Sequence, residues 1–258
     1  MKSLNESVLE ALDGRDMEIL PYLPYILQDL WEIGASSSAV LHILRKNGFS
    51  GEKEFNVLDL GCGKGAVSVA LAHKFGWKVL GIDGISAFID EARFKAKEYE
   101  VNRLCTFEVG DIREEVKKRN GFDLVVLGSI GPVFGNHYKT LTSVSRSLKP
   151  GRYVLYDDGY IPDASDFRSS SYTTYSEMKK QIELAGMDIV DELIGGLDDM
   201  MYSEEFMQEQ ITRRSNELML KYPEKKKLFE NYIKSQEEEI FLLENKLVCS
   251  TLLLKKRE

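Results

Sequence analysis

The sequence predicts an α/β fold built on a mostly parallel β-sheet with helices on both faces. Between residues 55 and 161, short runs rich in Val, Leu, Ile, Phe or Tyr alternate with helical stretches. Each run is bounded by Gly, Asp or Pro, and strands that alternate with helices form right-handed βαβ units. A glycine-rich turn between the first strand and the first helix, with Gly61, Gly63 and Gly65 at alternate positions, is the third observation.

The length and composition favour one domain. The chain has 258 residues, of which 43% are hydrophobic and 29% charged, enough to build one large core in a soluble protein. We expect a single domain over residues 1–258. It divides into an N-terminal helical cap at 1–50, a core at 51–161, and further helices with closing strands at 162–258.

The sequence of the core predicts five strands and three helices. The strands are expected at Asn56–Leu60, Lys78–Asp83, Cys105–Val109, Phe122–Leu127 and Tyr153–Asp157. The helices are expected at Gly65–Phe75, from Ser86 onward with Ser86 as the cap, and at Asn136–Leu148 before the turn Lys149-Pro150-Gly151.

The last hundred residues depart from simple alternation. A helix is expected at Tyr175–Ala185 and a strand at Met187–Leu193. A charged helical stretch follows at 203–246 with a break near Pro223, either a lid or dimer surface, or a solvated helix pair packed on the sheet. A last strand at Leu247–Lys255 fits the edge of the sheet more easily than another βαβ repeat.

Charge and cysteine content narrow the partners. The net charge of −8 and a pI of about 5.2 disfavour a nucleic-acid partner, because an acidic body repels phosphate backbones. Cys62, Cys105 and Cys249 are too few and too scattered for a disulfide framework. No apolar run approaches the ~20 residues of a membrane helix, and the N-terminus lacks a signal-peptide core. We expect a cytoplasmic protein without a membrane partner, as a monomer or a homodimer.

The segment Val57–Ser68, VLDLGCGKGAVS, carries the main chemical signal. Glycine has no Cβ, so the backbone can turn sharply and lie against a ligand, while the following helix N-terminus offers free N–H groups. Because Gly61, Gly63 and Ala66 also satisfy the G-x-G-x-x-G/A fingerprint, the pattern alone does not choose between NAD and another nucleoside cofactor. A tight turn without a ligand is the less favoured third interpretation.

Two aspartates follow later strands. Asp83 closes the second strand, 22 residues after Gly61, where a carboxylate can accept hydrogen bonds from a ribose diol. Asp111 follows the third strand and can accept from an adenine amino group, with Ile85 and Ile112 on the two faces of the base. A helix-capping role is the alternative for each, and for Asp111 alone it is at least as favoured.

These ordered signals resemble the class I S-adenosylmethionine (SAM)-dependent methyltransferases over roughly residues 55–160. The resemblance implies a Rossmann-like three-layer sandwich with seven strands, the last antiparallel. Its motifs match Asp59-x-Gly61-x-Gly63-x-Gly65, Asp83, Gly110-Asp111-Ile112, Phe122–Val126 and the turn Leu148–Arg152.

The resemblance also implies SAM as cofactor and a set of binding residues. Asp59 would orient the loop or meet the SAM amino group, the backbone of Cys62 would contribute within the loop, and Ser129 would sit beside the transferring methyl. The full set comprises Asp59, Gly61, Cys62, Gly63, Gly65, Asp83, Gly84, Ile85, Gly110, Asp111, Ile112, Gly128 and Ser129.

Methyl transfer requires alignment and exclusion of water, and a base only for a protonated acceptor. His137, Asp157 and Tyr160 are the candidate catalytic residues. For His137 a solvated position at a helix N-terminus is the favoured alternative. Asp157 and Asp158 follow the fifth strand and would hold a cationic amine or help a metal; we assign no metal, because an isolated Asp-Asp pair more often forms a turn.

The acceptor is predicted only as a class. Tyr22, Tyr25 and Trp31 either wall the active site or belong to the core. At the fourth-motif position the chain has Gly-Ser-Ile-Gly-Pro (128–132), not an Asn-Pro-Pro-Tyr signature, and it has no Pro-Cys pair. With the acidic charge, these features favour a small-molecule acceptor methylated on oxygen or nitrogen. The alternatives are an NAD-dependent oxidoreductase, a non-catalytic SAM-binding module, and methylation of protein or RNA.

Overall fold

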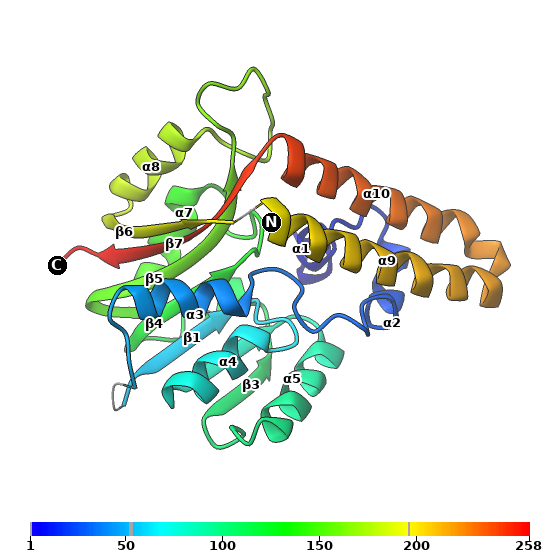
Figure 1. Cartoon of the computed structure of the whole chain (residues 1–258). Helices are drawn as coiled ribbons and strands as arrows, with labels where there is room; N and C mark the ends of the chain where they lie inside the picture. The colour runs from blue at the N-terminus through cyan, green and yellow to red at the C-terminus, as the bar shows by residue number, and fades with distance from the viewer. Residues whose placement is uncertain (1, 52–53, 196) are drawn as a thin grey trace.

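The computed structural model describes residues 2–51, 54–195 and 197–258, with residues 197–203 described by their backbone only. Within these residues the chain forms one seven-stranded sheet in the order β3-β2-β1-β4-β5-β7-β6 (Figure 1). The strands are β1 (Asn56–Leu60), β2 (Lys78–Asp83), β3 (Cys105–Val109), β4 (Phe122–Gly128), β5 (Leu148–Tyr160), β6 (Met187–Ile194) and β7 (Val248–Lys256).

The sheet is parallel except for its last strand. Strands β1 to β5 pair in parallel with their neighbours, and β7 is antiparallel to both β5 and β6. This confirms the predicted Rossmann-like fold. The predicted edge position of the last strand is wrong, because β7 lies between β5 and β6. Leu252, Leu253 and Leu254 are completely buried, as on a strand covered on both faces.

Helices cover both faces of the sheet. On one face α3 (Ser37–Lys46), α4 (Ala66–Phe75) and α5 (Ser86–Glu98) share a core with the strands. On the other, α6 (Ile112–Glu115), α7 (His137–Ser145) and α8 (Tyr175–Leu184) do the same. Helix α4 is apolar nearly all round, as a helix pressed onto a sheet must be, and ends at Gly76, whose φ is +71°. Ser86 is the first residue of α5, whose cap position is taken by Ile85.

The N-terminal cap packs on the late helical insertion. The cap consists of α1 (Leu4–Ala11), the 3₁₀ helix η1 (Met17–Tyr22) and α2 (Leu23–Ile26). The insertion is a helical hairpin of α9 (Leu197–Lys221) and α10 (Lys226–Asn245), joined at η2 (Pro223–Lys225), near the predicted break. Figure 1 shows this hairpin extending away from the sheet beside the cap. Completely buried Leu23, Ile26 and Phe229 lie in their shared core, each contributing about 1.5–3 kcal/mol.

Strand β5 is longer than the sequence predicts. Its pairing with β7 runs residue by residue from Tyr153 to Tyr160, so Asp157 and Tyr160 lie within the strand and do not follow it. At the other end, the predicted turn around Gly151 (φ +66°) is incorporated as an irregular start of the strand. In the described part of the chain, no helix combines the length and apolarity that crossing a membrane requires.

Candidate cofactor and active site

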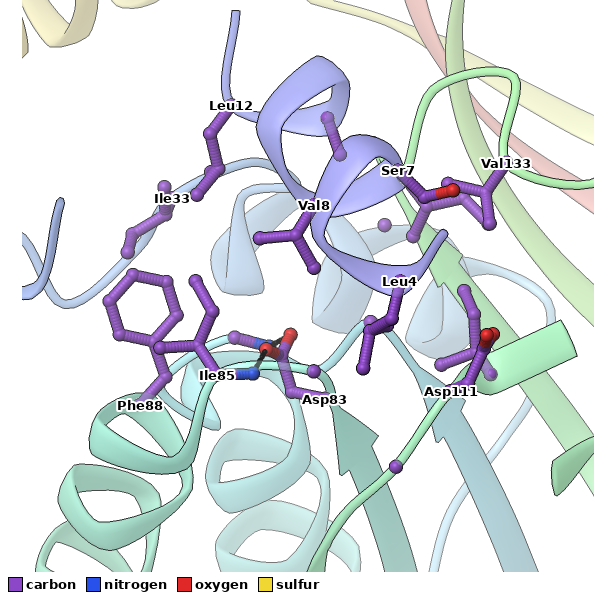
Figure 2. A pocket seen from close by; sticks show the side chains of 18 of the residues that line it. Leu4, Ser7, Val8, Leu12, Ile33, Asp83, Ile85, Phe88, Asp111 and Val133 are labelled. Carbon is purple, nitrogen blue, oxygen red and sulfur yellow. Dashed lines mark hydrogen bonds between the residues drawn. The ribbon is translucent and has the colours of Figure 1, made fainter. Parts of the chain in front are cut away.

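A cavity lies where the carboxyl ends of β1, β2, β3 and β4 meet. This is the position at which ligands bind in open α/β sheets. We call it the strand-end cavity; Figure 2 shows it between helix α1 and the strand ends. Its lining from the sheet side comprises Gly61, Gly63, Asp83, Gly84, Ile85, Phe88, Gly110, Asp111, Ile112, Gly128, Ser129, Ile130 and Val133.

The glycine loop presents bare backbone to the strand-end cavity. The backbone N–H groups of Gly61 and Cys62 donate to the Ile82 carbonyl at 2.8 and 3.1 Å, which fixes the turn against β2. Gly63 has a φ of +52°, and a Cβ built there would meet no protein atom within 4 Å. Space is therefore free beside Gly63 for a ligand to approach the main chain.

Gly65 serves packing instead. A Cβ on Gly65 would lie 2.9 Å from the Ala92 Cβ and 3.0 Å from the Phe107 ring, and its φ is +78°. It is the residue before α4, and it does not line the strand-end cavity. The two glycines therefore serve different purposes. Gly63 leaves room for a ligand, and Gly65 leaves room for Ala92 and Phe107 to pack against the backbone.

Asp83 is fixed at the wall of the cavity. Its Oδ2 accepts from the Gly63 N–H and its Oδ1 from the Ile85 N–H, both at 2.9 Å (Figure 2). Burial raises the pKa of this carboxyl, while the N–H donors act in the opposite direction. Each carboxylate oxygen can accept more than one hydrogen bond, so both keep capacity for hydroxyl donors from a ligand.

Asp111 lies at the same edge of the sheet, after β3. It caps α6, and the Arg113 side chain grips its carboxylate from Nε and Nη2, the shortest contact being 2.7 Å. Hydrogen bonding to Arg113 lowers the pKa of Asp111, so the carboxylate stays ionised. Figure 2 shows Asp111 across the cavity from the Ile85 and Phe88 side.

Ser129 marks the opposite end of the cavity. It is a non-glycine residue with a φ of +55°, a conformation that costs energy and that often accompanies functional sites. Its Oγ donates to the Asp157 Oδ1 at 2.5 Å, and Thr251 Oγ1 donates to Oδ2 at 2.5 Å. Burial raises the pKa of Asp157. Asp157 does not line the cavity itself and is connected to it through Ser129.

Three of the predicted cofactor residues do not line the cavity: Asp59, Cys62 and Gly65. Asp59 is 3% exposed and accepts a hydrogen bond from the Ser68 hydroxyl at 2.6 Å. Burial raises the pKa of Asp59 to about 7. The contact with Ser68 ties β1 to α4, which matches the loop-orienting role implied by the resemblance rather than direct ligand contact.

His137 is buried, so the interpretation as a solvated residue is wrong. It is 8% exposed; its Nδ1 lies 2.7 Å from the Tyr156 hydroxyl and its Nε2 3.0 Å from Thr173 Oγ1. Because the Tyr156 hydroxyl donates to Asp158, the proton of a neutral His137 belongs on Nδ1. Burial lowers the pKa of His137. The imidazole lies outside the lining of the strand-end cavity.

The remaining predicted residues also lie outside the cavity. Tyr160 is 6% exposed and packs on Tyr175, with ring centroids 4.6 Å apart. Tyr22 of the cap packs edge-on against Phe229 of α10. The Tyr25 hydroxyl donates to Glu217 on α9. The Trp31 indole donates to the Lys64 carbonyl at 3.1 Å. In the described residues no cluster of His, Cys, Asp and Glu has metal-site geometry.

The sequence interpretation expected an N-terminal helical cap but missed the residues of this cap that form the outer wall of the cavity. Helix α1 supplies it, together with Leu12 and Ile33 (Figure 2). The sequence did contain a signal for this helix, because Ser3 and Glu6 form a capping box that starts a helix at Leu4. The residues of α1 that line the cavity are Leu4, Ser7, Val8 and Ala11.

Lys64 is a second residue that the sequence interpretation missed. It is 1% exposed, and its ammonium donates to the Leu27 carbonyl at 2.7 Å and pairs with Glu91 at 2.9 Å. Burial lowers the pKa of this lysine. Lys64 therefore joins the glycine loop to the segment after α2 through two hydrogen bonds. Its ammonium donates to Leu27, and its carbonyl accepts from Trp31.

Comparison with known families identifies the family to which the chain belongs. A family model described as a methyltransferase domain matches residues 51–217, more than half of the chain. The chain belongs to this methyltransferase family. The family confirms the prediction of a SAM-dependent methyltransferase and gives SAM as the cofactor, in place of NAD.

Curated relatives match over the cofactor-binding part only. The 23S rRNA (uracil(1939)-C(5))-methyltransferase RlmD of Shewanella halifaxensis is 33% identical over 98 residues, 38% of this chain and 21% of the relative. The ubiquinone biosynthesis O-methyltransferase of Coxiella burnetii (strain Dugway 5J108-111) is 30% identical over 101 residues, 39% of this chain and 42% of the relative. The matches span less than half the length of either relative.

A solved structure matches nearly the whole chain. The SAM-dependent methyltransferase of Geobacter sulfurreducens, in complex with S-adenosylhomocysteine, aligns with a TM-score of 0.76 at 18% identity. The alignment covers 92% of this chain and 98% of that chain. At this identity the likeness supports the fold and leaves the acceptor open.

The residues of the strand-end cavity fit SAM. The open space beside Gly63 admits a ligand against the main chain, and Asp83 holds an acceptor ready for a ribose diol. Ile85 and Ile112 both line the cavity, where a flat base needs apolar walls. The fit rests on the shape and donor–acceptor character of this chain's own side chains.

Proposed function

We propose that this protein methylates an oxygen or nitrogen atom of a small molecule, with SAM bound in the strand-end cavity. One observation supports the proposal most directly. A single cavity joins the glycine loop, Asp83, Asp111 and Ser129, which the sequence interpretation had assigned separately to the methionine, ribose, adenine and methyl ends of the cofactor.

Each part of the cavity then has a task. Bound SAM supplies a methyl group that its sulfonium sulfur activates. The backbone at Gly61 and Gly63 accommodates the amino-acid end, and Asp83 accepts hydrogen bonds from the ribose. Asp111 lies at the adenine end, while Gly128 and Ser129 lie toward the methyl and the acceptor. Apolar side chains from α1 exclude water.

For an acceptor that arrives protonated, the pair Ser129–Asp157 offers a route for the proton. Of the predicted catalytic residues, Asp157 is the one hydrogen-bonded to a residue that lines the cavity. We propose that the acceptor gives its proton to the Ser129 oxygen while the Ser129 hydroxyl proton passes to Asp157. Burial raises the pKa of Asp157, which makes its carboxylate a better base.

Enclosure and charge favour a small acceptor. The outer wall formed by α1 narrows the cavity, and the net charge of −8 opposes a phosphate backbone. Among the relatives, the ubiquinone biosynthesis O-methyltransferase fits this class, whereas the rRNA methyltransferase represents the competing class. An acceptor screen must therefore contain both phenolic or amine metabolites and RNA.

Titration calorimetry with SAM and with S-adenosylhomocysteine tests the cofactor assignment. Asp83→Ala should weaken binding by about 1–3 kcal/mol, because hydrogen bonds from a charged acceptor are lost. Asp111→Ala should cost less, since the Asp111 carboxylate is already occupied by Arg113. Asp90→Ala is the matched control, because Asp90 is an exposed carboxylate on α5 that pairs with Arg93 on the same helix.

Two results would contradict the assignment: equal SAM affinity for wild type and Asp83→Ala, or binding of NADH in preference to SAM. Thermal unfolding of each variant must accompany the titrations, since Asp83 also holds the Gly63 and Ile85 N–H groups. Formation of S-adenosylhomocysteine with any acceptor in the screen separates an enzyme from a module that binds SAM without turnover.

A further inference from the structure

Arg113 connects two parts of the protein that are remote in sequence. It lies on α6, two residues after Asp111, and its guanidinium binds the Asp111 carboxylate through Nε and Nη2. Its Nη1 donates to the Lys2 carbonyl at 2.9 Å and to the Ser7 hydroxyl at 2.8 Å. One planar side chain therefore uses all three nitrogens to join the β3 edge of the sheet to helix α1.

Helix α1 depends on this side chain at its N-terminal half. Within the described part of the chain, the hydrogen bonds that join residues 2–7 to residues beyond α1 are the two donated by Arg113. The remaining bonds there are internal, such as the capping box of Ser3 and Glu6. At the other end, Tyr232 and Gln236 on α10 donate to the Leu12 carbonyl at 3.2 and 3.1 Å.

Helix α1 lines the cavity along its whole length, and Arg113 holds its N-terminal half. Leu4, Ser7 and Val8 line the cavity, and Figure 2 shows Leu4 and Val8 directed toward the strand ends beside Asp83. A Cβ on Gly84 would lie 2.9 Å from Val8 and 3.1 Å from Leu4, so α1 rests directly on the turn after β2. Loosening the N-terminal half of α1 would open the outer wall.

We propose that Arg113 is a positioning residue that couples the adenine end of the cofactor site to α1. The Asp111 carboxylate orients the guanidinium, and the guanidinium holds α1 closed over the cavity. Asp111 thus acts on the cofactor partly through the helix. The identity of the ligand rests on the proposed function, whereas the coupling itself is a property of the protein without ligand.

The coupling predicts a specific change in binding kinetics. Without Arg113 the closed position of α1 is less populated, and the apparent affinity falls with that population. Arg113→Met keeps the length of the side chain and removes its donors. S-adenosylhomocysteine should dissociate about tenfold faster from this variant, as expected when charged hydrogen bonds are lost, with a smaller change in association.

Hydrogen exchange and stopped-flow dissociation together test the proposal. Without ligand, the amides of α1 in Arg113→Met should exchange about tenfold faster, while β1 and α4 keep their wild-type protection. Arg119→Met is the matched control, because Arg119 pairs with Glu108 and Glu115 and makes no hydrogen bond to α1. Arg113→Lys, which restores one charged donor, should recover part of both effects.

A double variant makes the test sharper. Ser7→Ala should accelerate exchange of α1 by a smaller factor, and adding it to Arg113→Met should have little further effect, because the two residues share one bond. Wild-type exchange of α1 and wild-type dissociation in Arg113→Met would overturn the proposal. Tighter binding in that variant would also overturn it, because α1 would then obstruct the cofactor. Failure of the wild type to bind SAM or S-adenosylhomocysteine would refute the proposed function and leave the exchange result to decide the coupling.

Discussion

Replacing Gly63 by asparagine tests whether the glycine loop receives the cofactor against its main chain. Gly63 has a φ of +52°, and no protein atom lies within 4 Å of the position its Cβ would take. Gly63 lines the strand-end cavity, so a Cβ there enters open space at the edge of the cavity. Asparagine is the suitable replacement, because it tolerates the left-handed region better than most residues.

The magnitude follows from overpacking. A side chain forced into occupied space typically costs 1–3 kcal/mol, so we expect the dissociation constant of SAM to rise by about 5- to 150-fold. The backbone itself costs up to about 1–2 kcal/mol of stability, since a left-handed conformation is unfavourable for a residue with a Cβ. These two effects must be measured separately.

Gly76→Asn provides that separation. Gly76 has a φ of +71°, its Cβ position is equally free of neighbours, and it lies at the end of α4, away from the cavity. Titration calorimetry should show weakened SAM binding only in Gly63→Asn, while chemical unfolding shows similar losses of stability in both variants. Equal SAM affinity in the two variants, close to that of the wild type, would refute the placement of the cofactor beside Gly63.

Two further predictions concern stability. Burial raises the pKa of Asp59 from 3.8 to about 7, so between these values the folded protein keeps a proton that the unfolded chain releases, and the free energy of unfolding falls as pH rises. Asp59→Asn removes this titration. Urea unfolding at about pH 4 and pH 8 should show the difference between wild type and variant changing by up to about 4 kcal/mol, and a constant difference would count against the raised pKa. Lys64→Met leaves the Leu27 carbonyl without its donor and should cost about 1–3 kcal/mol in urea unfolding. Lys117→Met, which removes an exposed pair with Glu114, should cost less than about 1 kcal/mol, and equal losses in the two lysine variants would show that the Lys64 contacts contribute little.

Much of the fold could be predicted because local patterns coincide with the final packing. Strands β1, β2 and β3 have the predicted bounds, since each is a short run rich in apolar residues and bounded by Gly or Asp. The end of β5 was not predictable in this way. Its extension to Tyr160 depends on pairing with β7, about ninety residues later in the chain, and no local signal encodes that pairing.

The candidate site also contains residues that local patterns predicted correctly and residues whose placement depends on distant parts of the chain. Most of the predicted cofactor residues line the strand-end cavity, because parallel strands place their carboxyl ends at one edge and the residues after them must meet there. His137, Asp157 and Tyr160 were chosen for the same edge but lie behind the wall. Which way a side chain points at a strand end depends on its neighbours across the sheet, as Thr251 shows for Asp157.

The sequence by itself determined the sheet core, the glycine loop and the acidic residues that follow the strands, because each is encoded within a few residues of its own position. Only the tertiary structure determined which residues form the outer wall of the cavity, the position of β7 between β5 and β6, and the hydrogen bond from Arg113 to Ser7. These features join segments that are far apart in the chain. Their free energy comes from contacts that form only once the whole chain has folded.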